Sequence, residues 1–194
     1  MMRNLLALPF VFFLCGCGEP KLPSPFQARD ISAQYSGTDF HLAGHTGKPH
    51  SLADFSGKVV VLFFGYTHCP DFCPTTLSDL AQVMRLLGKD AERVQVLFVT
   101  LDPERDTREL LAQYAPAFYP SFLGLSGDVQ ATREAAKAFG VSYQKQGGKN
   151  GYTLDHSTGT YIIGASGKPL LLAPYGQSTG QLVQDIKLLL SLAR

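Results

Sequence analysis

The 194-residue chain has no excess of charge of either sign. It carries 17 lysines and arginines and 16 aspartates and glutamates, so the formal net charge is +1. There is no basic run and no helix with a basic stripe, which argues against nucleic acid as a partner. Internal repeats and low-complexity segments are also missing. Hydrophobic residues make up 45% of the chain and charged residues 17%, which favours one globular domain with a sizeable core.

The amino-terminal apolar run, Leu5 to Leu14, is too short to cross a bilayer as a helix. With Arg3 as the only charge before it, this run has the form of a secretory signal. It ends in Leu14-Cys15-Gly16-Cys17, which resembles the lipobox of bacterial lipoproteins, where cleavage precedes the cysteine. We therefore expect residues 1–16 to be a lipoprotein-type signal peptide and Cys17 to carry a lipid. The alternative is an ordinary signal or an uncleaved anchor, with Cys17 unmodified.

Cysteine is scarce, with four in the chain. Cys15 would leave with the signal and Cys17 would be acylated, which leaves Cys69 and Cys73 as the only free thiols. In an exported protein such a pair normally forms a disulfide unless something reduces or occupies it. The protein would be lipid-anchored, in the periplasm or on the outer face of the cytoplasmic membrane. Residues 17–30, with three prolines, would tether the domain to that membrane.

The stretch after Gly57 places these two cysteines in the expected fold. Val59 to Phe64 is a short apolar run, rich in β-branched and aromatic residues, which is typical of a strand buried on both faces of a sheet. The loop with the two cysteines follows, and Pro74 begins a helical pattern that continues to residue 87. Reactive crevices of open α/β sheets lie just beyond the carboxyl ends of strands, where Cys69 and Cys73 would fall.

The remaining elements alternate between strands and helices. A hairpin is expected around Thr46-Gly47-Lys48. Asp106 or Thr107 is expected to start a later helix, with Glu109 placed for a capping box with Asp106. This alternation, followed by a late hairpin and a last helix, indicates an α/β, thioredoxin-like sandwich over residues 31–194 with an N-terminal β-hairpin extension. The other expected elements are strands at 94–99, 161–163 and 170–172 and helices at 107–114, 129–139 and 179–192.

The spacing of Cys69 and Cys73 allows two kinds of chemistry. Residues four apart lie about one helical turn from each other, roughly 6 Å between Cα atoms in a helix. That separation permits a disulfide and also lets both sulfurs hold one ion. A helix N-terminus lowers the pKa of a thiol, which makes a pair more reactive and a better ligand. The pair therefore indicates redox or metal chemistry, with a structural disulfide that staples a loop as the alternative.

The motif F-G-Y-T-H-C-P-D-F-C-P-T-T-L carries a specific resemblance. Together with V-T-L-D-P-E-R-D-T and the later L-D-H-S, it is similar to the Sco/SenC family of copper chaperones, from about Tyr35 to the C-terminus. The resemblance implies a thioredoxin-like fold, Cu(I) and Cu(II) bound by Cys69, Cys73 and His156, and a role in assembling the dinuclear copper site of cytochrome c oxidase. The copper-site subunit of that oxidase would be the partner, and another copper donor or a thioredoxin-like reductant would be a second.

The types of donor agree with copper. Thiolates are soft ligands that suit Cu(I), and an imidazole helps to accommodate Cu(II). Zinc is the competitor, because two cysteines, a histidine and a water would form a catalytic-type zinc site, although no fourth ligand is evident at zinc-like spacing. Without the resemblance, His156 would be interpreted as a surface-loop residue. There is no proline between Pro120 and Pro169, where thioredoxins place a cis-proline loop facing the cysteines, and this disfavours a general oxidoreductase.

Other polar residues near the cysteines have competing interpretations. By analogy with the family, Asp102 tunes the site or faces the partner; equally, it holds Arg105 or caps the next helix. His68 could be a spare ligand, but a ring that points away is favoured. The early hairpin carries three histidines, His41, His45 and His50. They could form a second metal site, but simple exposure on the hairpin is the favoured interpretation.

Two functions would use the same cysteines. The first is a copper metallochaperone for oxidase assembly, and the alternative is a thiol-disulfide reductase of that oxidase or of another exported target. His156 discriminates between them, because copper binding requires it and dithiol exchange does not. A peroxiredoxin-like peroxidase is disfavoured. Such an enzyme would have a Pro-x-x-x-Thr segment before its reactive cysteine and an arginine nearby, which Thr67-His68-Cys69 does not supply.

Overall fold

The computed structural model describes residues 24–35, 38–148 and 151–193. The expected signal peptide, the lipidation site Cys17 and the first part of the expected tether lie outside these residues. No helix in the described ranges has the length and apolar character needed to cross a membrane. The elements, with η for a 3-10 helix, are β1 (Arg29–Asp30), β2 (Leu42–Gly44), β3 (Pro49–His50), η1 (Leu52–Phe55), β4 (Val59–Gly65), α1 (Phe72–Leu87), η2 (Gly88–Arg93), β5 (Val94–Thr100), α2 (Arg108–Phe118), β6 (Leu123–Ser126), α3 (Val129–Ala138), β7 (Tyr143–Gly148), β8 (Gly151–His156), β9 (Thr160–Ile163), β10 (Pro169–Ala173) and α4 (Thr179–Leu192).

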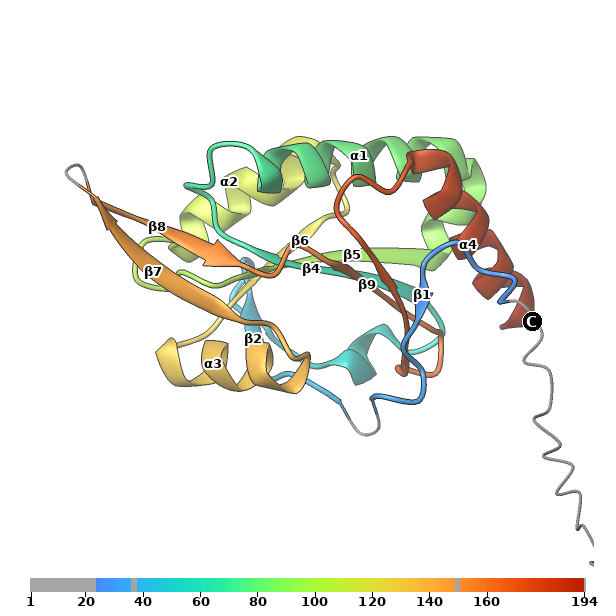
Figure 1. Cartoon of the computed structure of the whole chain (residues 1–194), viewed down its shortest axis with the longest axis horizontal. Helices are drawn as coiled ribbons and strands as arrows, with labels where there is room; N and C mark the ends of the chain where they lie inside the picture. The colour runs from blue at the N-terminus through green and yellow to red at the C-terminus, as the bar shows by residue number, and fades with distance from the viewer. Residues whose placement is uncertain (1–23, 36–37, 149–150, 194) are drawn as a thin grey trace, which may run out of the picture.

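Strand β4 lies in the middle of a mixed eight-stranded sheet with the order β1-β10-β9-β4-β5-β6-β2-β3. It pairs in parallel with β5, from Val59 opposite Val94 to Gly65 opposite Thr100, and antiparallel with β9. Every residue of β4 is buried, as expected for branched and aromatic side chains packed on both faces. Helices α1, α2 and α4 cover one face of the sheet, and α3 lies against the other (Figure 1). This is the α/β sandwich that the sequence indicates.

The early hairpin is confirmed, because β2 and β3 pair antiparallel with Leu42 opposite His50. β2 also pairs with β6, so the hairpin forms one edge of the main sheet. Strand β6 itself was not predicted, because its sequence L-G-L-S is short and contains a glycine. That glycine has a packing role: a Cβ at Gly124 would lie 3.0 Å from the Cβ of Leu111, so α2 can pack closely on β6.

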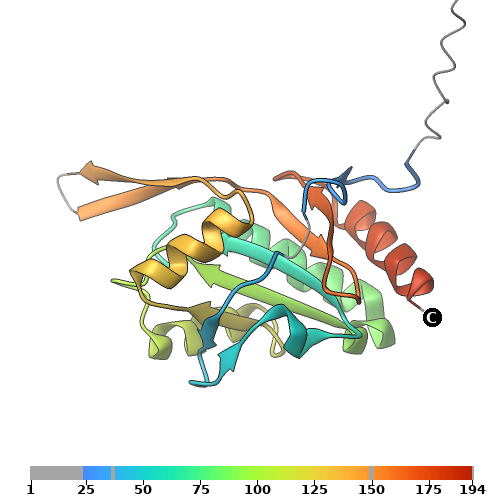
Figure 2. The same cartoon turned by 90° about the horizontal axis from the view of Figure 1, so that it is seen from below.

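Strands β7 and β8 form a separate two-stranded arm that projects from the body of the protein (Figures 1 and 2). Their antiparallel register places Tyr143 opposite His156 and Gly148 opposite Gly151. The sequence did not predict these strands, because they are rich in polar residues and glycine and lack an apolar alternation. The arm matters for the site because His156 is its last residue.

Helix α1 begins two residues earlier than predicted. Its first residue is Phe72 rather than Pro74, so Cys73 lies in the first turn. Pro74 is tolerated at this position because the first four N–H groups of a helix have no partner within the helix. The predicted apolar stripe is buried, and it consists of Leu77, Leu80, Val83, Met84 and Leu87. The early start brings the sulfur of Cys73 close to the end of β4, where a Cβ at Gly65 would lie 2.7 Å from it.

Helix α2 is capped by one of the two residues predicted to start it, and it ends at Phe118 rather than at about Tyr114. Thr107 is its N-cap, and the Thr107 hydroxyl oxygen accepts a hydrogen bond from the Leu110 N–H at 3.2 Å. The predicted capping box between Asp106 and Glu109 is wrong, because the Asp106 side chain is buried inside the protein. The helix also continues through Pro116, where packing of α2 against β6 outweighs the loss of one backbone hydrogen bond.

Candidate metal centre

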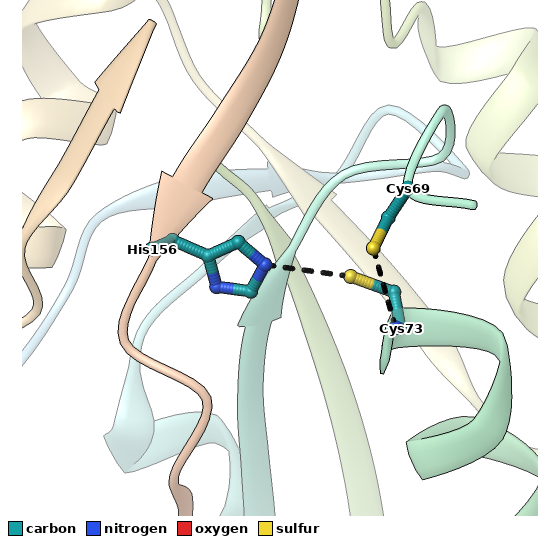
Figure 3. Close-up of side chains that lie close together, drawn as sticks. All are labelled: Cys69, Cys73 and His156. Carbon is teal, nitrogen blue, oxygen red and sulfur yellow. Dashed lines mark hydrogen bonds between the residues drawn. The ribbon is translucent and has the colours of Figure 1, made fainter. Parts of the chain in front are cut away.

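Three side chains with metal-binding atoms converge beyond the carboxyl end of β4. The sulfurs of Cys69 and Cys73 and a ring nitrogen of His156 all lie within 4.8 Å of one another. His156 Nε2 is 3.6 Å from Cys73 Sγ, although the two residues are 83 positions apart (Figure 3). Across the described ranges, no other group of three or more His, Cys, Asp or Glu side chains could hold a metal ion. The fold therefore brings together the three residues that the sequence singled out.

The two cysteines lie in the loop after β4 and in the first turn of α1. The Cys69 N–H donates to the Tyr66 carbonyl at 3.3 Å, which turns the loop back toward the helix. The Cys73 N–H, which has no helical partner, donates to Cys69 Sγ at 3.5 Å. Both thiols are free, and Cys69 is 8% exposed whereas Cys73 is completely buried. Cys73 is thus the inner ligand candidate and Cys69 the outer one.

Burial raises the pKa of the Cys73 thiol well above its ordinary value. The predicted lowering by the helix N-terminus is therefore wrong for Cys73, because removal from water disfavours the thiolate more than the helix stabilises it. A bound cation would act in the opposite direction, since a metal ion stabilises the thiolate that coordinates it. Without a metal ion, Cys73 stays protonated and is a poor nucleophile.

His156 is oriented so that one ring nitrogen is left for a metal. Its Nδ1 lies 2.9 Å from the carbonyl oxygen of Ser157, so the Nδ1–H donates there and Nε2 keeps its lone pair. Burial lowers the pKa of His156, which keeps the ring neutral near pH 7. The ring stands edge-on to Phe63 and Tyr66, with centroid separations of 6.4 and 5.9 Å. A neutral imidazole with this tautomer is the form that binds metal ions.

A cavity of about 450 Å³ opens over the cysteines and the histidine. Cys69 and His156 line it, whereas Cys73 lies deeper. An ion or a partner's side chain would therefore reach the centre past Cys69 and His156. The full lining is Tyr66, Cys69, Pro70, Phe72, Thr153, Leu154, Asp155, His156 and Thr158.

Asp106 supports the cysteine loop, a role that the sequence did not reveal. Its carboxylate accepts hydrogen bonds from the Thr67 N–H at 2.9 Å, the Thr67 hydroxyl at 2.6 Å and the Thr100 hydroxyl at 2.6 Å. These bonds join the residues before Cys69 to the end of β5. The sequence signal was ambiguous, because Asp106 and Thr107 are both good helix caps and only one of them can be the cap.

Asp102 lies outside the group of metal-binding atoms. Its buried carboxylate accepts hydrogen bonds from Arg105 Nε at 2.5 Å and from the Tyr152 hydroxyl at 2.7 Å. The structure thus has the interaction with Arg105 that was one of the two interpretations. A role in tuning the site stays a prediction, and direct contact with a partner would require this fully buried side chain to move.

The remaining histidines do not converge with the cysteines. His68 is 51% exposed, and its ring turns toward the carboxylate of the buried Asp106. On the early hairpin, His45 Nδ1 accepts a hydrogen bond from the Gly124 N–H at 3.1 Å, and His50 stacks on an aromatic ring. Of the three hairpin histidines only His41 is exposed, whereas His45 and His50 are partly buried, so the expectation of simple exposure is wrong for those two.

Comparison with known proteins relates this site to a family. The sequence model described as SCO1/SenC matches residues 28–191. The chain belongs to the SCO1/SenC family. The mitochondrial protein SCO2 homolog of Homo sapiens is 41% identical to this member over 145 residues, which are 72% of this chain and 53% of that protein. The chain spans roughly half to three-fifths of the length of the vertebrate SCO2 relatives that it matches.

Solved Sco structures have the same fold as this SCO1/SenC chain. Apo Sco1 from Thermus thermophilus matches with a TM-score of 0.72 and 48% identity, over 78% of this chain and 90% of that one. ScoI from Bradyrhizobium japonicum, with copper bound, matches with a TM-score of 0.72 and 35% identity, over 77% of this chain and 96% of that one. The thioredoxin-like fold is therefore confirmed. This member carries a Cys-Cys-His group that could bind copper.

Proposed function

We propose that this SCO1/SenC protein is a copper metallochaperone that delivers copper to the dinuclear site of cytochrome c oxidase, or matures that site. The observation that carries the proposal is the convergence of two sulfurs and one imidazole nitrogen within 4.8 Å. Cys69, Cys73 and His156 are the proposed ligands of a single copper ion. The copper-site subunit of the oxidase is the proposed partner.

The donor set favours copper over zinc. Two thiolates satisfy Cu(I), and the imidazole provides the harder donor that Cu(II) gains from. Zinc sites are usually four-coordinate, and in the described part of the chain no fourth His, Cys, Asp or Glu joins the group. Because Cys69 and His156 line the cavity, copper can enter and leave as cargo while Cys73 anchors it from below.

The proposal includes export and a lipid anchor on Cys17, with residues 17–30 as the tether. The described end of this tether is fastened to the domain, since the N–H groups of Gln27 and Ala28 each donate to the Asp185 carboxylate at 2.8 Å. The last two residues of residues 17–30 form strand β1, which pairs with β10 and lies on the side of the molecule away from the β7–β8 arm (Figure 1). An anchor attached there would leave the arm and the metal site accessible to a partner.

Two free thiols side by side also favour a second candidate, a thiol-disulfide reductase. In that reaction one thiolate attacks a target disulfide, and the second cysteine resolves the mixed disulfide. Cys69 and Cys73 end as a disulfide, and the target receives two electrons and becomes a dithiol. His156 has no necessary part in this exchange.

Metal analysis of a soluble form starting near Lys21 tests the proposed function. The reduced protein is expected to bind one copper per chain, and the protein oxidised to the Cys69–Cys73 disulfide is expected to bind none, because a disulfide has no thiolate to donate. The double variant Cys69→Ser, Cys73→Ser is expected to lose copper, and His68→Ala is the matched control that keeps it. Stoichiometric copper in the oxidised protein or the double variant would refute these ligands and favour the hairpin histidines.

A further inference from the structure

His156 reaches the site on an arm that is not paired with the main sheet. β7 and β8 hydrogen-bond only to each other among the described strands, and the arm extends away from the body (Figure 2). The two cysteines are carried by the loop and helix that follow the buried strand β4. His156 is therefore the one candidate ligand whose position depends on how a peripheral element is fastened to the core.

Arg105 fastens β8 to the loop after β5. Its Nη1 donates to the Tyr152 carbonyl at 2.9 Å, and its guanidinium carbon lies 3.7 Å from the centre of the Tyr152 ring. Its Nε donates to one carboxylate oxygen of Asp102, and the Tyr152 hydroxyl donates to the other at 2.7 Å. The three side chains form a closed ring of contacts, which we call the latch (Asp102, Arg105 and Tyr152).

The latch also contacts the wall of the metal site. The Arg105 guanidinium lies 5.9 Å from the centre of the Tyr66 ring, and the Tyr66 ring stands against the ring of His156. On β8, residues two apart face the same side, so Tyr152 and His156 project from one face of the strand. A displacement of Tyr152 from Arg105 would therefore move the backbone that carries His156 and remove support from the Tyr66 side.

We infer that Arg105 and Tyr152 are positioning residues that hold His156 Nε2 at coordinating distance from the cysteine sulfurs. The inference rests on the proposed copper site. A displaced His156 should affect the binding of Cu(I) and of Cu(II) differently. Cu(I) is satisfied by two thiolates, whereas Cu(II) depends more on the imidazole, so a loosened latch weakens Cu(II) binding selectively.

The variant Arg105→Lys tests the latch in the full reduced protein, with copper ions as the probe. Lysine keeps the positive charge beside Asp102 but lacks the planar fork needed to bond Asp102 and the Tyr152 carbonyl while stacking on the ring. We expect Cu(II) affinity to fall about 10-fold, which is the lower end of the effect of removing a residue that holds a metal ligand in place. The thiolate-to-Cu(II) absorption band should shift as well. Cu(I) affinity should stay within about 2-fold of the parent. Arg133→Lys, the same change at an exposed arginine of α3, should alter neither affinity.

Tyr152→Phe is the second variant, because it removes the hydroxyl bonds to Asp102 at 2.7 Å and to Glu104 at 3.4 Å and keeps the ring on Arg105. It should weaken Cu(II) binding in the same direction but less. Parent-like Cu(II) affinity and spectra in both variants, while His156→Ala loses Cu(II), would overturn the latch and leave the proposed function standing. Equal loss of Cu(I) and Cu(II) with a lower Tm would also overturn it, since the latch would then only support the fold. A parent that binds no copper would overturn the proposed function and the latch with it.

Discussion

At the scale of single residues, Gly65 shows how tightly the chain is packed around Cys73. A Cβ added to Gly65 would lie 2.7 Å from Cys73 Sγ, 2.9 Å from a ring carbon of Phe98 and 3.1 Å from a ring carbon of Phe63. Glycine at the end of β4 therefore allows the backbone to pass directly beside the sulfur. The position of the inner ligand depends on the absence of a side chain at this point.

We predict that Gly65→Ala destabilises the protein by about 1–3 kcal/mol, the usual effect of overpacking, and weakens copper binding because Cys73 is displaced. Gly180→Ala is the control, since a Cβ there meets nothing within 4 Å in helix α4. That change should stabilise the protein by roughly 0.5–1 kcal/mol. Denaturant unfolding and copper titration on the same samples provide both readouts. An unfolding midpoint for Gly65→Ala equal to that of the parent would contradict the packing described.

At the scale of elements, the segments with strong apolar patterns could be predicted from the sequence. Helix α4 has the predicted bounds, Thr179–Leu192, and the expected strand in β4 is buried along its whole length. The arm could not be predicted, because β7 and β8 have few apolar residues. Their attachment depends on tertiary contacts between Arg105 and Tyr152, which no local pattern encodes.

The candidate site was predictable to a different degree for each ligand. Cys69 and Cys73 follow from the residues themselves, because a strand, a short loop and a helix place them at the carboxyl edge of the sheet. His156 followed only from the family resemblance, since a lone histidine before a strand has many ordinary explanations. What brings it within 3.6 Å of Cys73 Sγ is the fold of the arm, which the sequence pattern did not indicate.

At the junction between β5 and α2, the neighbouring residues Asp106 and Thr107 have different roles, and their contributions to stability can be compared. Asp106→Ala leaves two donors of the half-buried Thr67 and the buried hydroxyl of Thr100 without their acceptor and should cost at least about 2 kcal/mol of folding free energy. Thr107→Ala removes the helix cap and should cost about 1 kcal/mol. The free energies come from denaturant unfolding. If Thr107→Ala were the more damaging change, Asp106 would not be the support of the cysteine loop.

At the scale of the whole molecule, the described amino-terminal end and the candidate metal site are separated. Strand β1 and the end of α4 lie on one side, and the β7–β8 arm extends on the other (Figure 1). Cys69 opens into a cavity that β8 helps to line. A protein attached to a membrane through its amino-terminal segment could thus present the metal site to a membrane-bound oxidase.

We predict that deleting the gene lowers cytochrome c oxidase activity under copper limitation, and that added copper restores part of it. The parent gene should restore full activity, whereas the Cys69→Ser, Cys73→Ser gene should not, because it lacks both proposed sulfur ligands. Oxidase activity of membranes grown at low and high copper is the measurement. Unchanged oxidase activity together with greater sensitivity to oxidants would favour the reductase function.

The central claim is that His156 completes a copper site with the two cysteines, and the His156→Ala variant tests it most directly. Cu(I) is titrated against a competing chelator, and Cu(II) is followed by its thiolate-to-metal absorption, with His68→Ala as the control. We predict that Cu(I) affinity is largely kept, because two thiolates suffice for Cu(I). Cu(II) affinity should fall by at least about 10- to 100-fold. That is the usual effect of losing a residue that only supports a ligand, and losing the ligand itself costs no less. If His156→Ala binds Cu(II) as tightly as the parent, His156 is not a ligand and the proposed site is wrong.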